Sequence, residues 1–167
     1  WMLVAENDRD AMKIGKHDTR DRVFVMAEIG NNHEGDARLA HRMIREAAAA
    51  GADAVKFQTI VPRRLVSADQ EEELRNEPLQ LSREIHASLA AEAVSAGIQF
   101  LSTPFDIEAV DWLAPLVPAF KVASGDNNFW ALMERIAETG KPAIVSLGLG
   151  GSNHADRIVD FFRIAWQ

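Results

Sequence analysis

Five short, largely apolar runs, each followed by a stretch of helical period, constrain the fold of this chain more than any other feature of its sequence. The runs are Val23–Ile29, Asp53–Thr59, Ile98–Thr103, Ala119–Gly125 and Pro142–Gly148. Strands that alternate with helices in this way usually lie parallel in a sheet that the helices cover. Parallel strands are buried on both faces, which agrees with the nearly continuous apolar character of the runs. The sequence therefore predicts an α/β fold.

The helices that follow the runs begin and end at recognisable capping residues. The first helix is expected after the N-cap Asp36 and before Gly51, and the second after the N-cap Ser82 and before Gly97. Three further helices are expected within residues 106–116, 128–140 and 153–166. The charged segment 1–22 has no such pattern and is expected to be an N-terminal lead segment.

Two architectures fit five βα units, namely a doubly wound sheet and a β/α barrel. A complete barrel has eight units and about 250 residues, whereas this chain of 167 residues supplies five. No linker and no low-complexity segment divides the chain. The longest connection, Ile60–Leu81, holds an acidic run that we expect to be a solvated loop.

The composition excludes several classes of function. Acidic residues outnumber basic ones by 25 to 18, the net charge is -7 and no basic stripe is present, so a nucleic-acid partner is not expected. Without cysteine there is no disulfide, no thiolate zinc site and no cysteine nucleophile. No apolar run approaches the roughly 18 residues of a membrane span, so we expect a cytoplasmic protein with no membrane partner. The chain starts with Trp rather than Met, which makes a fragment the expectation.

Polar residues end or follow every predicted strand, where parallel α/β folds place their functional groups. In chain order these residues are Glu28; Lys56 and Gln58; Ser102 and Thr103; Lys121, Ser124 and Asp126; and Ser146. A lysine within an apolar strand is costly to bury unless it meets an anion. Two such lysines beside serines and glycine turns predict a pocket for a phosphate or a carboxylate.

Each of these residues also has a simpler structural interpretation. Lys56 could form a structural ion pair with Glu28 on a neighbouring strand, and Ser124 and Ser146 could cap the turns that follow them. His33 is expected to form hydrogen bonds within its loop rather than to bind a metal. The histidines of the predicted helices, at positions 41, 86 and 154, are expected at the surface or between helices. The agreement of all five strand ends favours the pocket over these separate explanations.

Five sequence blocks, taken in order, give the chain a resemblance to a known family. They read AEIGNNHEGD, VKFQT, FLSTPFD, KVASGD and KPAIVSLG, and the similarity runs from about Val23 to about Phe162. The chain resembles the sialic acid (N-acetylneuraminate) synthases and the related legionaminate and pseudaminate synthases. The resemblance implies a parallel (β/α) barrel of the TIM type, of which residues 23–167 form the N-terminal part, about five of eight units. The small C-terminal antifreeze-like domain of the family is absent from this sequence.

The resemblance also implies a reaction. Enzymes of this family condense phosphoenolpyruvate with the open-chain aldehyde of an N-acetylated amino sugar, such as N-acetylmannosamine, to give a nonulosonic acid and phosphate. A divalent metal ion, Mn²⁺ or Mg²⁺, polarises the aldehyde oxygen, and the full-length enzymes are expected to be homodimers. The family's two metal-binding histidines lie on later strands, so we expect no complete metal site within this chain.

The family's functional residues fall on the polar strand ends when they are carried over by position. The resemblance implies that Glu28 and Lys56 are catalytic, with Glu28 facing the amino sugar and Lys56 meeting phosphoenolpyruvate. It implies substrate-binding roles for four further residues, which are Gln58, Lys121, Ser124 and Ser146.

Two other functions stay open from the residues alone. The chain could be a non-catalytic remnant that retains an anion-binding pocket, or an aldolase that forms a Schiff base through Lys56 or Lys121. A piece of a barrel also leaves sheet edges unpaired. We therefore expect the isolated chain to be inactive or nearly so, and to misfold, aggregate or pair with another copy.

Overall fold

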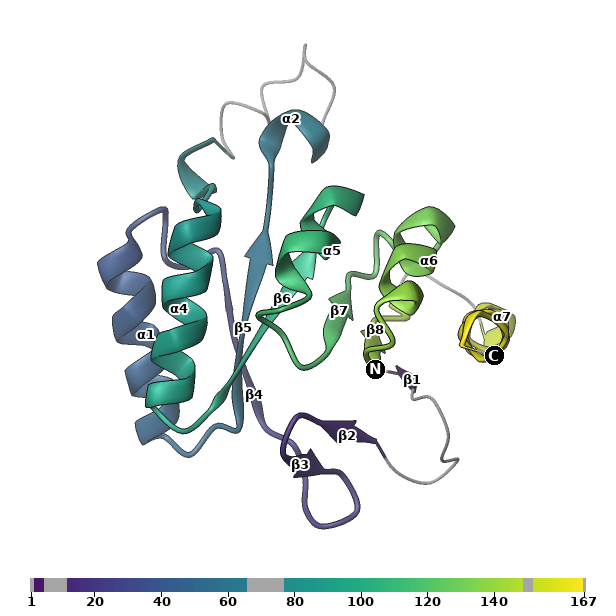
Figure 1. The fold of residues 1–167 in the computed structure, drawn as a ribbon, viewed down its shortest axis with the longest axis horizontal. Coiled ribbons are helices and arrows are strands. Elements are labelled where there is room, and N and C mark those ends of the chain that lie inside the picture. The colour runs from purple at the N-terminus through teal and green to yellow at the C-terminus, as the bar shows by residue number, and fades with distance from the viewer. Residues whose placement is uncertain (1, 5–11, 66–76, 149–151, 167) are drawn as a thin grey trace. The chain divides into compact units, whose positions relative to one another are not determined.

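The computed structural model describes residues 2–4, 12–65, 77–148 and 152–166 of the chain (Figure 1). The chain divides into two compact units. The central unit is Phe24–Val117, and the terminal unit combines Trp1–Val23 with Pro118–Gln167. Both units contain parallel strands connected through helices, so the predicted α/β class is confirmed.

The sheet of the central unit has three parallel strands in the order β4, β5, β6. The elements of this unit are β4 (Met26–Gly30), α1 (Ala37–Ala49), β5 (Ala54–Thr59), α2 (Pro62–Leu65), the 3-10 helix η1 (Glu77–Leu79), α4 (Arg83–Ser95), β6 (Gln99–Pro104) and α5 (Ile107–Leu113). In Figure 1, α1 and α4 lie side by side next to this sheet. The chain thus follows the strand–helix alternation that the sequence predicts.

The two long helices of the central unit begin and end where the sequence predicts. The Asp36 carboxylate accepts a hydrogen bond from the Arg38 N–H and begins α1, and the Ser82 hydroxyl makes the equivalent contact at the start of α4. The glycines after these helices, Gly51 and Gly97, have φ of +86° and +81°. Such angles favour glycine just beyond a helix C-terminus.

Side chains alternate between the two faces of the central sheet, and the faces differ in chemistry. On the helix-covered face of β5, Phe57 is fully buried and the Thr59 hydroxyl lies 3.0 Å from Nε2 of His86 in α4. On the opposite face, β5 carries Lys56 and Gln58. The apolar core therefore lies between the sheet and its helices, and Lys56 and Gln58 lie on the face away from it.

The terminal unit contains a second three-stranded sheet, in the order β1, β8, β7. The elements of this unit are β1 (Met2–Val4), β2 (Lys13–Ile14), β3 (His17–Asp18), β7 (Phe120–Val122), α6 (Trp130–Glu138), β8 (Ala143–Val145) and α7 (Ser152–Ala165). β7 and β8 are parallel and are connected through α6, as a βα unit requires. β2 and β3 form a short antiparallel hairpin.

The sequence analysis does not predict the N-terminal strand β1. This strand pairs antiparallel with β8, with Leu3 opposite Ile144. β8 therefore has a partner on each side, and the expectation of an unpaired edge is wrong at this strand. The segment 1–22 contains three short strands among its described residues, although the sequence assigns it no element.

Four of the five observed strands are shorter than the predicted runs, and β6 is shifted by one residue without being shorter. The first run is expected from Val23, but β4 begins at Met26, and Val23 is 79% exposed. The apolar character of that run therefore does not mark a buried strand along its whole length. β7 and β8 end early as well, so Ser124 and Ser146 lie beyond the strands that precede them.

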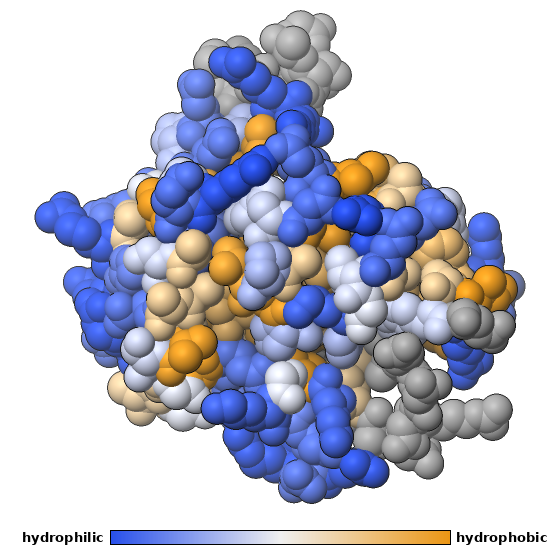
Figure 2. All heavy atoms as spheres, in the orientation of Figure 1, coloured by the Kyte–Doolittle hydropathy of each residue, from blue (hydrophilic) through white to orange (hydrophobic). Residues whose placement is uncertain are grey.

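The surface mixes hydrophobic and hydrophilic residues. On the face shown in Figure 2, hydrophobic residues (orange) are interspersed with hydrophilic ones (blue). The most exposed large hydrophobic side chains among the described residues are those of Val23, Val94 and Ile164, which lie far apart in the sequence. Within the described ranges, no helix has the length and apolar character needed to cross a membrane.

Candidate functional site

Two lysines are almost fully removed from solvent. Lys56 in β5 is 4% exposed and Lys121 in β7 is 3% exposed. An ammonium group leaves water at a high cost in free energy unless polar partners replace the water. Each lysine therefore marks a cluster of polar side chains.

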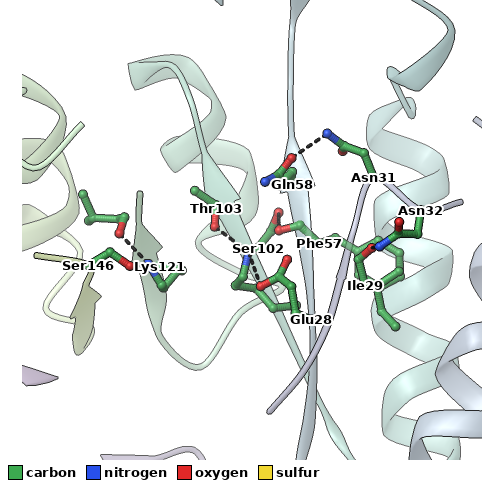
Figure 3. A network of polar contacts seen from close by, with 12 residues as sticks. Glu28, Ile29, Asn31, Asn32, Phe57, Gln58, Ser102, Thr103, Lys121 and Ser146 are labelled. Carbon is green, nitrogen blue, oxygen red and sulfur yellow. Dashed lines mark hydrogen bonds and ion pairs between the residues drawn. The ribbon is translucent and has the colours of Figure 1, made fainter. Parts of the chain in front are cut away.

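The first cluster surrounds Lys56 in the central unit. Its Nζ lies 2.8 Å from Glu28 Oε2 and donates a hydrogen bond to Thr103 Oγ1 at 3.1 Å, as the dashed lines at Glu28 and Thr103 in Figure 3 mark. Strand register causes these contacts, because Glu28 of β4 pairs with Lys56, and Thr103 of β6 pairs with Gln58 on the same face of β5. The Glu28 side chain is 49% exposed. Glu28 thus neutralises the buried ammonium group while its carboxylate stays accessible to a ligand.

Backbone geometry makes room for the Glu28 carboxylate. Gly30 has φ of +56°, and a Cβ at this position would stand 3.2 Å from Glu28 Oε1. A left-handed backbone and a close contact both favour glycine. The strand can therefore end here without displacing the carboxylate.

Gln58 lies on the same face of β5 as Lys56. Asn31, in the turn after β4, donates from Nδ2 to Gln58 Oε1 (Figure 3). Because this contact engages the amide oxygen of Gln58, its NH₂ group remains as the donor for other contacts. The turn after β4 thus orients an amide donor near Glu28 and Lys56.

The histidine of this turn holds the loop in place, as the sequence predicts. His33 is fully buried, its Nδ1 accepts a hydrogen bond from the Gly35 N–H at 3.0 Å, and its ring stacks on Phe57. Burial lowers the pKa of His33. A neutral histidine therefore fixes the loop that carries Asn31 to the core.

The second cluster surrounds Lys121 in the terminal unit. Its Nζ donates to Ser146 Oγ at 2.7 Å and to the Val122 carbonyl oxygen at 2.6 Å (Figure 3). The Ser146 N–H also donates to the Val122 carbonyl oxygen at 3.1 Å, which extends the pairing of β7 with β8. This backbone bond brings the serine hydroxyl beside the ammonium group.

Ser124 lies in the turn after β7 and is half-buried. Its Cβ is 3.9 Å from the position that a Cβ on Gly148 would occupy. The turns after β7 and β8 therefore approach each other closely, and Ser124 belongs to the same end of the sheet as Ser146.

Asp126 is a further candidate, which the sequence analysis places at a strand end without assigning it a role. Its Oδ2 is buried and has no hydrogen-bond partner in the described part of the chain. Burial raises the pKa of this carboxyl group. Its signal in the sequence is its position two residues after Ser124, in the block KVASGD. A carboxyl group with a raised pKa, in a turn that follows a buried lysine, is a candidate proton donor.

The structure thus divides the predicted site residues between two clusters. The central unit holds Glu28, Lys56 and Gln58, and the terminal unit holds Lys121, Ser124 and Ser146. Across residues 2–4, 12–65, 77–148 and 152–166, no group of three or more histidine, aspartate and glutamate side chains could hold a metal ion.

Comparison with known sequences identifies relatives of the chain. The model of the NeuB family matches residues 43–166, which is most of the sequence. An uncharacterized protein from Methanocaldococcus jannaschii is 43% identical over 127 residues, which cover 75% of this chain and 38% of that protein. The N,N'-diacetyllegionaminic acid synthase from Campylobacter jejuni is 36% identical over 143 residues, which cover 77% of this chain and 43% of the synthase.

A solved structure gives a similar result. The N-acetylneuraminic acid (sialic acid) synthetase from Leptospira borgpetersenii matches with a TM-score of 0.88 at 30% sequence identity, covering 93% of this chain and 56% of the synthetase. The chain spans less than half the length of the two curated relatives above. With its sequence matched over residues 43–166 and its fold matched over nearly its whole length, the chain belongs to the NeuB family, in agreement with its resemblance to the sialic acid, legionaminate and pseudaminate synthases.

Proposed function

We propose that this chain is the part of a nonulosonic acid synthase that binds phosphoenolpyruvate. The whole protein condenses phosphoenolpyruvate with an N-acetylated amino sugar and releases phosphate, working as a homodimer in the cytoplasm. The observation that carries the proposal is the pair of buried lysines, Lys56 and Lys121, each in a parallel strand with its polar partners near the carboxyl end. The match to the NeuB family, which covers residues 43–166 and so includes both lysines, supports the proposal.

In this proposal the two sheets are parts of one TIM-type (β/α) barrel, of which the chain supplies about five of eight units. The carboxyl ends of all strands meet at one mouth of such a barrel. The likeness to the sialic acid synthetase over 93% of the chain supports this arrangement.

The charge of phosphoenolpyruvate suits these clusters. The substrate carries a phosphate and a carboxylate, and both are held best by ammonium and hydroxyl donors together. Lys121 Nζ and Ser146 Oγ are 2.7 Å apart, so one anionic oxygen can contact both. Ser124 adds a hydroxyl from the adjacent turn of the same unit.

The reaction requires bond changes at three carbon atoms. C3 of phosphoenolpyruvate forms a bond to the aldehyde carbon of the sugar, water adds at C2, and phosphate leaves as its C2–O bond breaks. The attacking water loses both protons, one of which ends on the aldehyde oxygen and the other on the departing phosphate, and C2 becomes the carbonyl carbon of a ketone. Glu28 is half-exposed and held by Lys56, so it can exchange a proton with the sugar. The NH₂ group of Gln58 can donate a hydrogen bond to an oxygen of the sugar.

A divalent metal ion polarises the aldehyde in the family that the chain resembles. The described residues offer no cluster for that ion, and the roles of Glu28, Lys56 and Lys121 given above do not depend on it.

Schiff-base chemistry is the main alternative. It needs a neutral amine with a free lone pair. The amines of Lys56 and Lys121 instead donate to a carboxylate, hydroxyl or carbonyl oxygen at 2.6–3.1 Å. Anion binding fits these contacts better, and borohydride treatment in the presence of pyruvate should leave both lysines unmodified.

Thermal unfolding with and without phosphoenolpyruvate, in the presence of Mn²⁺, tests the proposal. A ligand that binds only the native state raises the midpoint of unfolding, and we expect such a rise here. Lys121→Met and Ser146→Ala should reduce the rise, whereas the control His41→Gln on α1 should keep it. A cooperative transition whose midpoint does not move would exclude a phosphoenolpyruvate pocket in this chain.

A further inference from the structure

A chain of hydrogen bonds connects helix α7 to the lysine–serine pair of the terminal unit. His154, in the first turn of α7, has its Nε2 2.9 Å from the Asn127 carbonyl oxygen and 3.0 Å from Asn127 Oδ1. Asn127 Nδ2 donates in turn to the Ser146 carbonyl oxygen at 3.1 Å. Asn127 is 5% exposed, so these hydrogen bonds replace those that its polar atoms would make with water.

The donor and acceptor roles in this chain of bonds follow from chemistry. Both Asn127 atoms that face His154 are oxygens, which only accept, so His154 Nε2 carries the hydrogen. The Asn127 amide therefore has its oxygen toward His154 and its NH₂ group toward Ser146. If the amide turned over, two oxygens would face each other at Ser146. The N–H of His154 thus selects the amide orientation that can hold Ser146.

Three hydrogen bonds fix Ser146. Its N–H donates to the Val122 carbonyl oxygen at 3.1 Å, its own carbonyl oxygen accepts from Asn127, and its Oγ accepts from Lys121 Nζ at 2.7 Å. The first two bonds hold the backbone that carries the hydroxyl. They therefore determine where the hydroxyl meets the ammonium group.

Aromatic packing braces His154. Its ring packs edge-on against Trp130 of α6, with centroids 6.0 Å apart. The Arg157 guanidinium lies 5.4 Å from the centroid of the same indole, and Phe161 lies 5.3 Å from it. α7 is thus fixed to α6, and the histidine has little freedom to turn away from Asn127.

We propose that His154 is a positioning residue for the anion pocket. It orients Asn127, which holds the Ser146 hydroxyl where that hydroxyl and Lys121 can share one anionic oxygen. The inference rests on the proposed function of this pocket and adds α7, an element outside the strand ends, to the groups that set its affinity for phosphoenolpyruvate.

Calorimetric titration of phosphoenolpyruvate into the full chain tests this role. His154→Phe keeps a ring against Trp130 but removes the N–H, and we expect an affinity about three- to tenfold lower, as for the loss of one hydrogen bond. His154→Gln keeps an N–H donor at similar reach and should restore most of the affinity. The matched control His41→Phe on α1 should bind like the parent chain.

A double-mutant cycle separates positioning from a general loss of packing. Ser146→Ala removes the hydroxyl on which His154 acts, so His154→Phe should lower the affinity little further in that background. If the two losses multiply, or if His154→Gln binds as weakly as His154→Phe, positioning through Asn127 is excluded. Should His154→Phe fail to fold, His154→Met, which also lacks the donor, replaces it.

The parent chain distinguishes this inference from the proposed function. A parent chain with no measurable affinity for phosphoenolpyruvate would overturn the proposed pocket and this inference with it. A parent chain that binds, together with His154→Phe binding equally well, would overturn only the positioning role.

Discussion

At the scale of single residues, a buried lysine can belong to a functional site or to a structural ion pair. Lys56 is 4% exposed and is held by Glu28 and Thr103. Replacing a whole buried ion pair with apolar side chains is often neutral or stabilising, whereas removing one partner is costly when the other stays buried. Stability alone is therefore a weak reason for a buried lysine at this position.

Lys56→Met should separate the two interpretations. We expect its free energy of unfolding to change little, because the half-exposed Glu28 carboxylate can be solvated once the ammonium group is gone, and we expect the thermal shift from phosphoenolpyruvate to be lost. Glu28→Gln, which leaves the ammonium group without its carboxylate, should instead lower stability. Urea unfolding of the three proteins provides the comparison. A Lys56→Met chain that is much less stable yet still responds to phosphoenolpyruvate would favour the structural ion pair.

The buried histidines predict a loss of stability in acid. Burial lowers the pKa of His33 and of His86 from the ordinary value of 6.5. The unfolded chain therefore binds more protons below pH 6.5, so the contribution of each histidine is complete above that pH and is lost as the pH falls through its folded pKa. We expect the free energy of unfolding to fall by up to about 1.4 kcal/mol per pH unit for each histidine.

Urea unfolding across this range, for the parent and for His33→Gln, tests the expectation. The variant should lose less stability on acidification, because one titrating group is gone. Comparison of the two chains at each pH is needed, because burial raises the pKa of Asp126 and makes its contribution change in the opposite sense. Parallel curves for the two chains would show that His33 does not titrate as its burial requires.

The sequence predicts only part of the site at this scale. Lys121 and Ser146 could be paired from the strand ends alone, because parallel strands bring their carboxyl ends to one edge. The contact between Asn127 and His154 could not be predicted in this way. The two residues are 27 positions apart in the chain, and their contact depends on where α7 packs against α6. Helical period predicts that α7 forms, but it does not predict against which element α7 packs.

At the scale of elements, the length of a helix or strand decides whether the sequence can predict it. The helices α1 and α4 have 13 residues each and capping residues at both ends, so period and caps predict them together. The strands β1, β2 and β3 have two or three residues and show no period. β1 also pairs with β8, far along the chain, and no local pattern can specify such a partner.

Two glycines with the same backbone angle give a test of element packing. Gly97, after α4, and Gly35, before α1, both have φ of +81°. A Cβ at Gly97 meets nothing within 4 Å, whereas a Cβ at Gly35 would stand 2.0 Å from the Pro78 carbonyl oxygen in η1. The first change adds only backbone strain, and the second also forces the loop after β4 away from η1.

We expect Gly97→Ala to lower the free energy of unfolding by about 1–2 kcal/mol, and Gly35→Ala to lower it clearly more. Chemical denaturation of both variants beside the parent measures the difference. Equal losses would mean that the contact between the β4 loop and η1 contributes little, and that this loop can move without disturbing the sheet.

At the scale of the whole molecule, the question is how much of a working enzyme this chain contains. It covers 56% of the sialic acid synthetase structure that it matches, and its described residues hold no cluster suited to a metal ion. The residues that it does hold are the ones for which we propose anion binding and proton exchange. We therefore expect this chain to bind phosphoenolpyruvate without turning it over.

We expect the isolated chain to show the thermal shift with phosphoenolpyruvate but to release no phosphate when N-acetylmannosamine and Mn²⁺ are added. A phosphate assay measures this, with Lys121→Met as the control for background hydrolysis. Phosphate release above that control would mean that the chain, alone or with further copies, completes an active site. A shift without release would place the phosphoenolpyruvate pocket in this chain, and it would place the groups that activate the sugar outside it.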